Sequence, residues 1–350
     1  MDCSEDIQQQ VRRALEARTP LRITGGNSKA FLCANSDAVA LGMAEHHGIL
    51  EYEPTELVVI ARSGTKLLDI QQILKEKDQQ LAFDPPVFNG QATLGGTLSC
   101  NMSGPRRPYT GAARDFVLGT TAINGFGEKV RFGGKVMKNV AGYDLSKLLT
   151  GSFGTLGVIL DAAIKVLPLP KHEISITVAG TAQQALECFA RWQRQSLPIT
   201  AACHSDDVMY VRLSGSEPAV KRARLEIGGE LCTDTPWHAI QEWQHDNFSC
   251  TYEETLWRII VPPAVAHLTI EGRWLIDWGG ALRWLKSNVD TEEIRLKVNK
   301  VGGFAYAVKG MLSSHARQNP VSAEAAAYHQ RIKNAFDPHG LFNPGIFPLG

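Results

Sequence analysis

The chain has 350 residues, enough for two domains and a large buried core. Apolar residues make up 44% and charged residues 21%, the proportions of a globular rather than a disordered protein. Lysine plus arginine equals aspartate plus glutamate at 36 each, and this zero net charge disfavours nucleic acid as the main partner, because neutralising phosphates requires a basic excess.

The start of the chain, MDCSEDIQQQ, lacks the basic and apolar regions of a signal peptide, and no run of 18 apolar residues occurs. The seven cysteines are widely spaced without a CxxC pair, which predicts neither a disulfide framework nor a metal site. The ten histidines show no HExxH, HxH or HxxxH spacing, so no metal is predicted. We expect a cytoplasmic protein whose cysteines are mostly buried thiols.

In chain order, the first half predicts a helix over 6–19, a short strand over 21–24 and a tight glycine loop over 25–31. A strand over 56–64 precedes a helix over 66–77, whose leucines and isoleucines form one face. Residues 81–114 read as loop. A β-hairpin over 116–134 turns at Asn124–Gly127, and an apolar strand follows over 156–167.

The sequence PLP near residue 170 predicts a domain boundary. Beyond it, strands such as 173–180 alternate with helices such as 182–195, the pattern of an α+β domain. The tryptophan-rich segment 273–285 predicts two strands that meet at Gly279–Gly280, with their tryptophans packed in the core. A last helix leads into a Pro/Gly turn over 325–347.

Three glycine-rich stretches lie in the first half. GGNSK (25–29) offers successive backbone N–H groups of the kind that bind anions, although two glycines alone are also typical of a simple turn. It is not a GxGxxG motif, which disfavours NAD. ATLGGTLSCNMSG (92–104) and GYDLSKLLTGSFGTLGVI (142–159) are the other two. Together they indicate one extended ligand that lies along all three backbones, with a pyrophosphate at the first.

The segment KNVAGYDLSKLLTGSFGTLGVILDAAIKVLP resembles the FAD-binding domain shared by vanillyl-alcohol oxidase and p-cresol methylhydroxylase. ATLGGTLSCNMSG, ARDFVLG and FDPHGLFNPG resemble the other signatures of this family, so the resemblance covers nearly the whole chain. Within the family, GNSKAFL, PTELVVIARSGT, SGPRRP and LIDWGGALRWL resemble the FAD-binding subunits of bacterial glycolate oxidases.

The resemblance implies an α+β fold: a two-subdomain, PCMH-type FAD-binding domain over 1–170, an α+β, ferredoxin-like cap over 171–315, and a segment over 316–350 that returns to the first domain. It implies FAD held non-covalently, because no histidine replaces the residue used elsewhere for covalent attachment, near Lys29. Carried over by position, the cofactor site comprises Gly25, Gly26, Asn27, Ser28, Lys29, Ala92, Thr93, Leu94, Gly95, Gly96, Asn101, Gly104, Gly151, Gly154, Thr155, Gly157, Val158 and Ile159.

The resemblance also implies a function: oxidation of glycolate to glyoxylate by hydride transfer to the flavin. The electrons would pass to an iron–sulfur subunit of a complex that also contains a second flavin subunit. Such a complex would touch a membrane only peripherally, at the cytoplasmic face of the inner membrane.

Two features depart from the family pattern. Phe153 replaces an acidic residue in GS-x-G, and residues 298–310 lack the histidines by which catalytic relatives hold a metal and substrate. Two alternatives therefore stay open: a self-sufficient FAD-dependent 2-hydroxy-acid dehydrogenase of the D-lactate type, and a non-catalytic scaffold subunit. No catalytic residue is assigned. Arg106, Arg107 and Arg114 are candidate carboxylate binders, although arginines beside glycine turns are more often surface or phosphate contacts.

Overall fold

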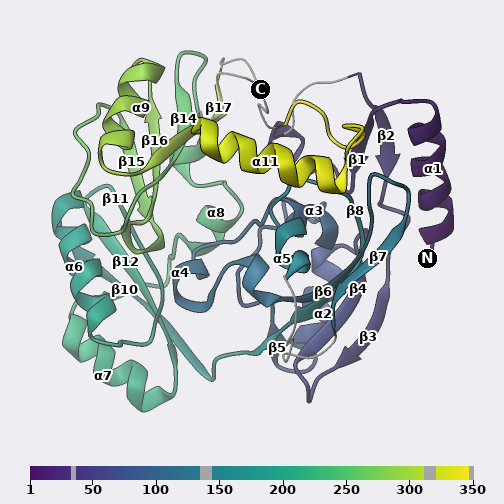
Figure 1. Cartoon of the computed structure of the whole chain (residues 1–350). Helices are drawn as coiled ribbons and strands as arrows, with labels where there is room; N and C mark the ends of the chain where they lie inside the picture. The colour runs from purple at the N-terminus through teal and green to yellow at the C-terminus, as the bar shows by residue number, and fades with distance from the viewer. Residues whose placement is uncertain (33–36, 135–143, 311–320, 347–350) are drawn as a thin grey trace. The chain divides into compact units, whose positions relative to one another are not determined.

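The computed structural model describes residues 1–32, 37–134, 144–310 and 321–346. The chain forms two compact units (Figure 1). The first unit comprises Met1–Ser103, Gly111–Leu169 and Pro320–Gly350, and the second comprises Gly104–Thr110 and Pro170–Asn319. A single boundary near residue 170 leaves residues 104–110 in the first domain, whereas in the structure they group with the second unit.

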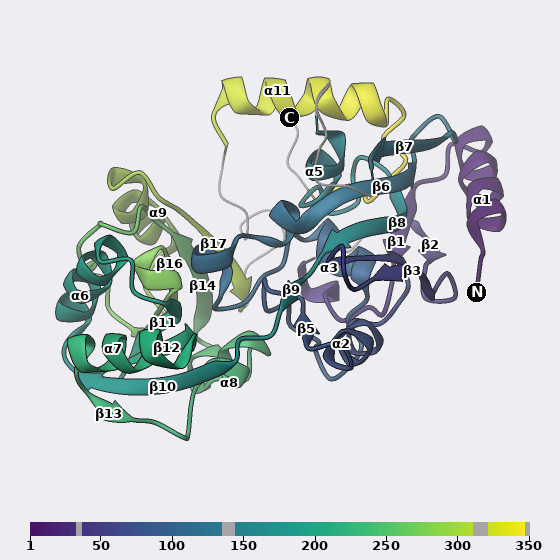
Figure 2. The ribbon, with the colours of Figure 1, turned by 90° about the horizontal axis from the view of Figure 1, so that it is seen from below.

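The first unit is built on a five-stranded antiparallel sheet of order β3-β4-β8-β6-β7. Its strands are β3 (Ile49–Glu53), β4 (Val58–Arg62), β6 (Val117–Ile123), β7 (Lys129–Gly133) and β8 (Val158–Lys165). The pairing of β6 with β7 confirms the predicted hairpin, and Figure 2 shows β6 beside β8. Two short strands, β5 (Gln79–Gln80) and β9 (Leu167–Pro168), pair separately.

The main core of this unit lies between the sheet and the helices α2 (Leu67–Lys75) and α3 (Leu94–Ser99). Alternate residues of β4, Val59 and Ala61, point into this core, as the two-residue period of a strand requires. The predicted face of α2 is confirmed at Leu67, Ile70 and Leu74, which are buried and recur at the helical period. Leu68, which was expected on the same face, is exposed instead.

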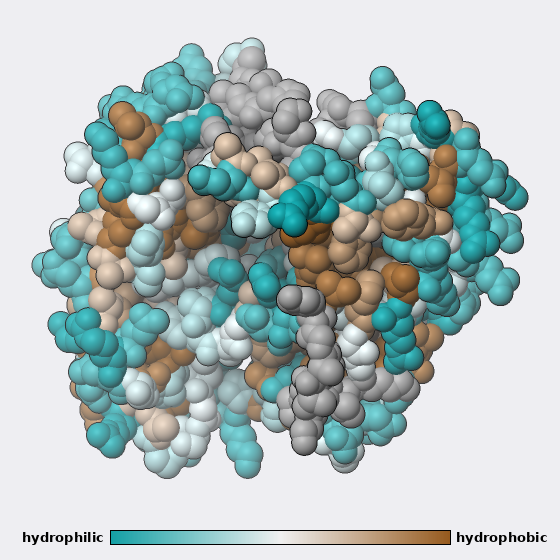
Figure 3. Space-filling view, in the orientation of Figure 1, coloured by the Kyte–Doolittle hydropathy of each residue, from teal (hydrophilic) through white to brown (hydrophobic). Residues whose placement is uncertain are grey.

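A second core joins the amphipathic helix α1 (Ser4–Glu16) to the parallel strand pair β1 (Leu21–Thr24) and β2 (Val39–Gly42). Ile7, Val11 and Ala14 form the buried stripe of α1, whose outer face is hydrophilic (Figure 3). Leu341 and Phe342 pack into the same core, so the segment after α11 (Ala323–Phe336) lies against β1. Leu21 N–H donates to the Leu341 carbonyl at 2.7 Å.

The end of α11 is fixed by a buried ion pair. Asp337 is 1% exposed, and its carboxylate accepts hydrogen bonds from the backbone N–H groups of Leu341 and Phe342, both at 2.9 Å. Lys333 Nζ lies 2.6 Å from the same carboxylate and donates to the Thr155 carbonyl at 2.6 Å. Residues 333–342 are therefore tied to the segment that precedes β8.

The second unit contains an eight-stranded sheet of order β13-β10-β12-β11-β15-β16-β14-β17. The first four strands and two helices follow the β-α-β-β-α-β order of a ferredoxin-like fold, which confirms the predicted α+β class. The strands are β10 (His172–Ala179), β11 (Ile199–Ser205), β12 (Val208–Gly215), β13 (Glu230–Leu231), β14 (Thr255–Ile260), β15 (Arg273–Asp277), β16 (Leu282–Ser287) and β17 (Phe304–Lys309).

Three helices, α6 (Ala182–Arg194), α7 (Glu217–Ile227) and α9 (Thr291–Lys300), bury their apolar residues against one face of this sheet. Strands β15 and β16 meet at the short 3₁₀ turn η4 (Trp278–Gly280), as predicted, and Trp278 and Trp284 are buried. Other short elements are η1 (Ala30–Leu32), α5 (Leu145–Leu149), α8 (Trp237–Gln241) and η3 (Asp246–Phe248).

Two expectations were wrong. The stretch 81–114, read as loop, contains α3, the single turn α4 (Arg107–Thr110) and the start of η2 (Ala113–Phe116), which are too short to show a helical period in the sequence. The cysteines are not mostly buried: among the described ones, none of which forms a disulfide, only Cys203 is buried. Cys33 lies outside the described residues.

Candidate cofactor site

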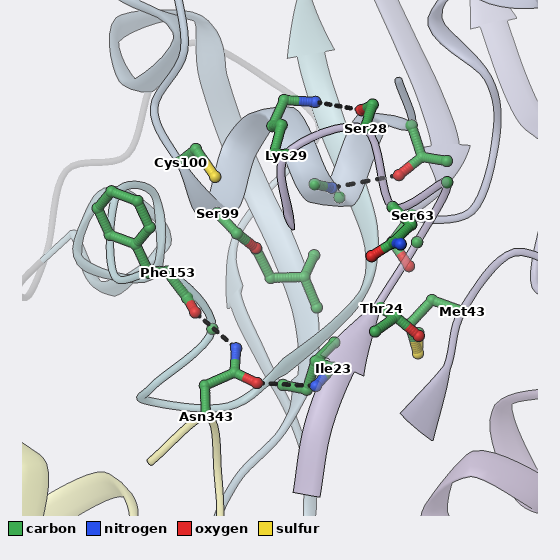
Figure 4. Close-up of a pocket in the computed structure, with 18 of the residues that line it drawn as sticks. Ile23, Thr24, Ser28, Lys29, Met43, Ser63, Ser99, Cys100, Phe153 and Asn343 are labelled. Atoms are coloured by element: carbon green, nitrogen blue, oxygen red, sulfur yellow. Dashed lines mark hydrogen bonds between the residues drawn. The ribbon is translucent and has the colours of Figure 1, made fainter. Parts of the chain in front are cut away.

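A cavity of about 150 Å³ lies in the first unit, where the glycine-rich stretches and the C-terminal segment converge (Figure 4). Such a volume suits one part of an extended ligand rather than the whole of a large one. Its lining residues are Arg22, Ile23, Thr24, Gly25, Gly26, Asn27, Ser28, Lys29, Ala30, Met43, Ser63, Thr93, Gly95, Gly96, Ser99, Cys100, Phe153, Gly154, Gly157, Ile159 and Asn343.

The first wall is the turn that follows β1. Gly26 is required by the protein itself, because a Cβ atom there would lie 1.7 Å from the Gln91 carbonyl oxygen. A Cβ on Gly25 would lie 2.5 Å from Thr93 Oγ1. Asn27 takes a positive φ of 56°, a conformation that asparagine tolerates. The two glycines thus let the turn 25–29 approach the segment 91–96 closely.

The second wall is the start of α3. Thr93 caps this helix, since its Oγ1 accepts a hydrogen bond from Gly96 N at 3.4 Å. Gly95 N donates to the Ser63 carbonyl at 2.7 Å, and a Cβ on Gly95 would lie 2.5 Å from Ser63 Cβ. A Cβ on Gly96 has more room: Thr93 Oγ1 would lie 3.3 Å away and Lys29 Nζ 3.9 Å away. Gly96 is therefore the glycine whose side chain would grow toward the cavity.

The third wall is the turn at Phe153 and Gly154, where both residues have a positive φ. Asn343 bridges this turn to β1: its Oδ1 accepts from Ile23 N and its Nδ2 donates to the Phe153 carbonyl, both at 2.7 Å (Figure 4). The Asn343 backbone N–H also donates to the Leu21 carbonyl at 2.8 Å. The amide of one residue thus holds two sides of the cavity together.

The electrostatics of the lining favour an anion. Lys29 is 7% exposed, Arg22 also lines the cavity, and none of the described lining residues is acidic. Ser63 is 3% exposed and its buried Oγ has no hydrogen-bond partner. A buried hydroxyl without a partner costs about 1–3 kcal/mol, so a bound acceptor would relieve that cost. The cations, hydroxyls and turn N–H groups fit a pyrophosphate.

The structure brings together eleven of the residues that the family resemblance implied: Gly25, Gly26, Asn27, Ser28, Lys29, Thr93, Gly95, Gly96, Gly154, Gly157 and Ile159 all line this cavity. Ala92, Leu94 and Val158 are buried in the two cores instead. Asn101, Gly151 and Thr155 lie outside the lining. Gly104 belongs to the second unit, where its carbonyl accepts a hydrogen bond from Trp278 Nε1 at 3.0 Å.

Sequence reasoning did not assign Ser63 or Asn343 to the site, and it noted Phe153 only as a departure within GS-x-G, yet all three line the cavity. Ser63 follows β4 directly, and Asn343 lies in the FNPG tail, so only their spatial convergence identifies them. The structure also bears on the arginines that were named as candidate carboxylate binders or surface residues. Arg114 is exposed, but Arg106 is 6% exposed and pairs with Glu173 at 3.1 Å, so it is not a surface residue.

One substitution separates cofactor binding from folding. We expect Gly96→Val to remove bound flavin while the melting temperature changes by only a few degrees, because the new methyl groups would extend toward the cavity. Gly154→Val is a poorer test: Gly154 has a φ of +69° and its Cβ would lie 2.7 Å from Asn343 Nδ2. Flavin absorbance per chain and thermal unfolding measure the two effects. If Gly96→Val still bound one flavin per chain, the bound cofactor would not lie beside residue 96.

Among the described residues, no group of three or more His, Cys, Asp or Glu side chains could hold a metal ion. None of the described helices is long and apolar enough to cross a bilayer. Residues 298–310, which contain no histidine, comprise the last residues of α9 and the strand β17.

Two protein-family models match parts of the chain. The family model for the FAD binding domain matches residues 2–133, which contain the first two walls. The family model for the C-terminal domain of FAD linked oxidases matches residues 292–346, which contain Asn343.

Over 344 residues, the chain is 44% identical to the glycolate oxidase subunit GlcE of Escherichia coli (strain K12), covering 98% of this chain and 97% of the relative. It is 31% identical to the glycolate oxidase subunit GlcD of Bacillus subtilis (strain 168), over 48% of this chain and 36% of the relative. It is 32% identical to a D-lactate dehydrogenase of Anaerostipes hadrus, over 50% of this chain and 37% of the relative.

The fold resembles a solved structure of alkyldihydroxyacetonephosphate synthase, with a TM-score of 0.69 at 14% identity. The match covers 98% of this chain and 75% of that one, and at this identity it shows the fold alone. The predicted PCMH-type FAD-binding fold and the resemblance that implied it are confirmed. The chain belongs to the family of FAD-linked oxidases, flavoproteins whose cofactor is FAD.

Proposed function

We propose that this chain is the FAD-binding subunit of a multi-subunit glycolate oxidase. The observation that supports this most directly is the match to a glycolate oxidase subunit, which extends over 98% of this chain and 97% of that relative. The dehydrogenase and GlcD matches cover only 37% and 36% of those relatives, so they do not support the whole activity of either relative for this chain.

In this proposal the first unit holds FAD without a covalent bond. The turn 25–29 and the ammonium of Lys29 bind the pyrophosphate, and Ser63 Oγ donates to it. Asn343 keeps the Phe153 turn and β1 in position around the cofactor. Bound FAD supplies the acceptor for the hydride that leaves the α-carbon of a 2-hydroxy acid. The protein supplies orientation and, through Lys29 and Arg22, a positive potential.

The finer assembly is also a proposal. The electrons leave through an iron–sulfur subunit, and a second flavin subunit completes the complex at the cytoplasmic face of the inner membrane. The zero net charge leaves little electrostatic repulsion between this chain and its partners.

The visible spectrum of the purified chain, before and after anaerobic addition of glycolate, tests the proposal. We expect a flavin band that stays oxidised with the chain alone and bleaches when the complex is reconstituted. Bleaching of the chain alone would instead identify a self-sufficient 2-hydroxy-acid dehydrogenase. Absence of the band in the isolated chain, together with a reconstituted complex that holds only the flavin of its second flavin subunit, would identify a scaffold and overturn the proposal.

A further inference from the structure

The cofactor cavity of the first unit contains one reactive side chain that the proposed function does not use. Cys100, which directly follows α3, lines this cavity. Its thiol is partly exposed, and it forms no disulfide with another described cysteine. A partly exposed cysteine is common and is not by itself a site. Its position in the cavity is what gives it a consequence.

The period of α3 turns Cys100 toward the cavity. Leu94 and Leu98 fill the core on one face of this helix, whereas Gly96 and Cys100 line the cavity. Cys100 N donates to the Gly96 carbonyl at 3.3 Å, so the two residues lie one helical turn apart on the same face. A Cβ on Gly96 would lie 3.9 Å from Lys29 Nζ. The thiol therefore lies on the face of α3 that is turned toward the Lys29 ammonium.

A separate observation indicates that a ligand occupies this space. Ser63 is 3% exposed, and its buried Oγ has no hydrogen-bond partner among the described residues, although the residue lines the same cavity. Figure 4 shows Cys100 and Ser99 on one side of the cavity and Ser63 on the other. Native proteins leave few buried hydroxyls without a partner. A ligand that supplies the partner of Ser63 would lie in the cavity that the thiol also lines.

Oxidation of Cys100 would change both the space and the charge of the lining. Lys29 and Arg22 line the cavity, and none of the described lining residues is acidic. Peroxide converts a cysteine thiol to a sulfenic acid, which adds an oxygen atom, and then to a sulfinic acid, which also adds a negative charge. Both products enlarge the side chain in a cavity of about 150 Å³. The negative charge would also oppose a bound pyrophosphate, because like charges repel.

We propose that Cys100 is a redox-modification site: hydrogen peroxide oxidises it in the flavin-free chain, and the oxidised chain no longer takes up FAD. The Cys100 thiolate attacks one peroxide oxygen, so that an S–O bond forms and the O–O bond breaks. The hydroxide that leaves takes up a proton and becomes water. The sulfur loses two electrons and the peroxide gains them. The inference rests on the proposed function, because FAD is the ligand that shields the thiol and whose uptake the oxidation controls.

Alkylation by iodoacetamide, followed by mass spectrometry of the cysteine peptides, tests the shielding without any substitution. We expect Cys100 to react about tenfold faster in the full flavin-free chain than in the FAD-loaded chain, because a thiolate reacts only where the reagent can reach it. Cys188 on α6 is the matched control, since it is also partly exposed but lies in the second unit. It should react at the same rate in both forms. Equal rates at Cys100 in the two forms, or no reaction in either, would overturn the inference.

The dissociation constant of FAD, measured before and after peroxide treatment of the flavin-free chain, gives an independent readout. We expect the treatment to raise this constant about tenfold or more, and dithiothreitol, which reduces a sulfenic acid, to restore it. In Cys100→Ser the constant should be the same before and after treatment.

Three results would contradict the inference: a Cys100 that peroxide leaves unoxidised, wild-type affinity for FAD in a chain whose Cys100 is oxidised, or an equal loss of affinity in treated Cys100→Ser. Failure of the proposed function shows differently. In that case the untreated wild-type chain binds no FAD, although its Cys100 still reacts with iodoacetamide.

Discussion

Asp337→Ala is expected to lower the free energy of unfolding of the first unit by about 3–5 kcal/mol, the usual effect of removing one partner of a buried ion pair. The Lys333 ammonium, 2.6 Å from this carboxylate, would stay in a largely buried position without its counter-charge. The backbone N–H groups of Leu341 and Phe342 would also lose their acceptor. Asn343 follows these two residues directly. The hydrogen bonds by which its side chain joins β1 to the Phe153 turn should therefore weaken, and flavin should be lost.

Urea unfolding followed by far-ultraviolet circular dichroism, together with flavin content per chain, measures both effects. Glu324→Ala is the matched control, because Glu324 is an exposed acidic residue in the first turn of the same helix. It should shift the unfolding midpoint little. Full flavin content and wild-type stability in Asp337→Ala would refute the role given to this ion pair.

Gly26→Ala is expected to abolish flavin binding and to destabilise the first unit by about 1–3 kcal/mol, because the site is already closely packed. The added Cβ would lie 1.7 Å from the Gln91 carbonyl oxygen, a distance that only a backbone shift can relieve. Such a shift separates the turn 25–29 from Thr93 and widens the cavity.

Gly42→Ala is the natural control for this substitution. Gly42 ends β2 and pairs with Thr24 immediately before the same turn, and a Cβ atom added to it would have no other side chain or backbone within 4 Å. This variant should retain flavin and wild-type thermal stability. If Gly26→Ala behaved like Gly42→Ala, the close approach of the two glycine-rich stretches would not be needed for the site.

Much of the fold follows from local sequence patterns. The helical period of Leu67, Ile70 and Leu74 predicts α2 and the face that it buries, and the glycine turn after Asn124 predicts the β6–β7 hairpin. The short helix α3 could not be predicted, because six residues with two adjacent glycines show no periodicity. Its stability comes from the Thr93 cap and from burial of Leu94 and Leu98, which are tertiary effects.

The cofactor site could be predicted only in part. The glycine-rich stretches mark where backbones approach closely, but the structure shows that several of these glycines are required by protein contacts, such as Gly26 with Gln91 and Gly95 with Ser63. Their presence is therefore weaker evidence for a ligand than the sequence alone indicates, and a scaffold without cofactor would keep them too. The buried Ser63 hydroxyl and the Lys29 charge support a ligand more directly, and the first of these emerges only from the fold.

The return of the chain to the first unit has a consequence for biosynthesis. Asp337 and Asn343 follow Pro170–Asn319 in the chain, so the ribosome makes the whole of that stretch before it makes either residue. Domains generally fold as their residues emerge during synthesis. We therefore expect the first unit to lack Asp337 and Asn343 until the second unit has been translated, and FAD to bind only after that point.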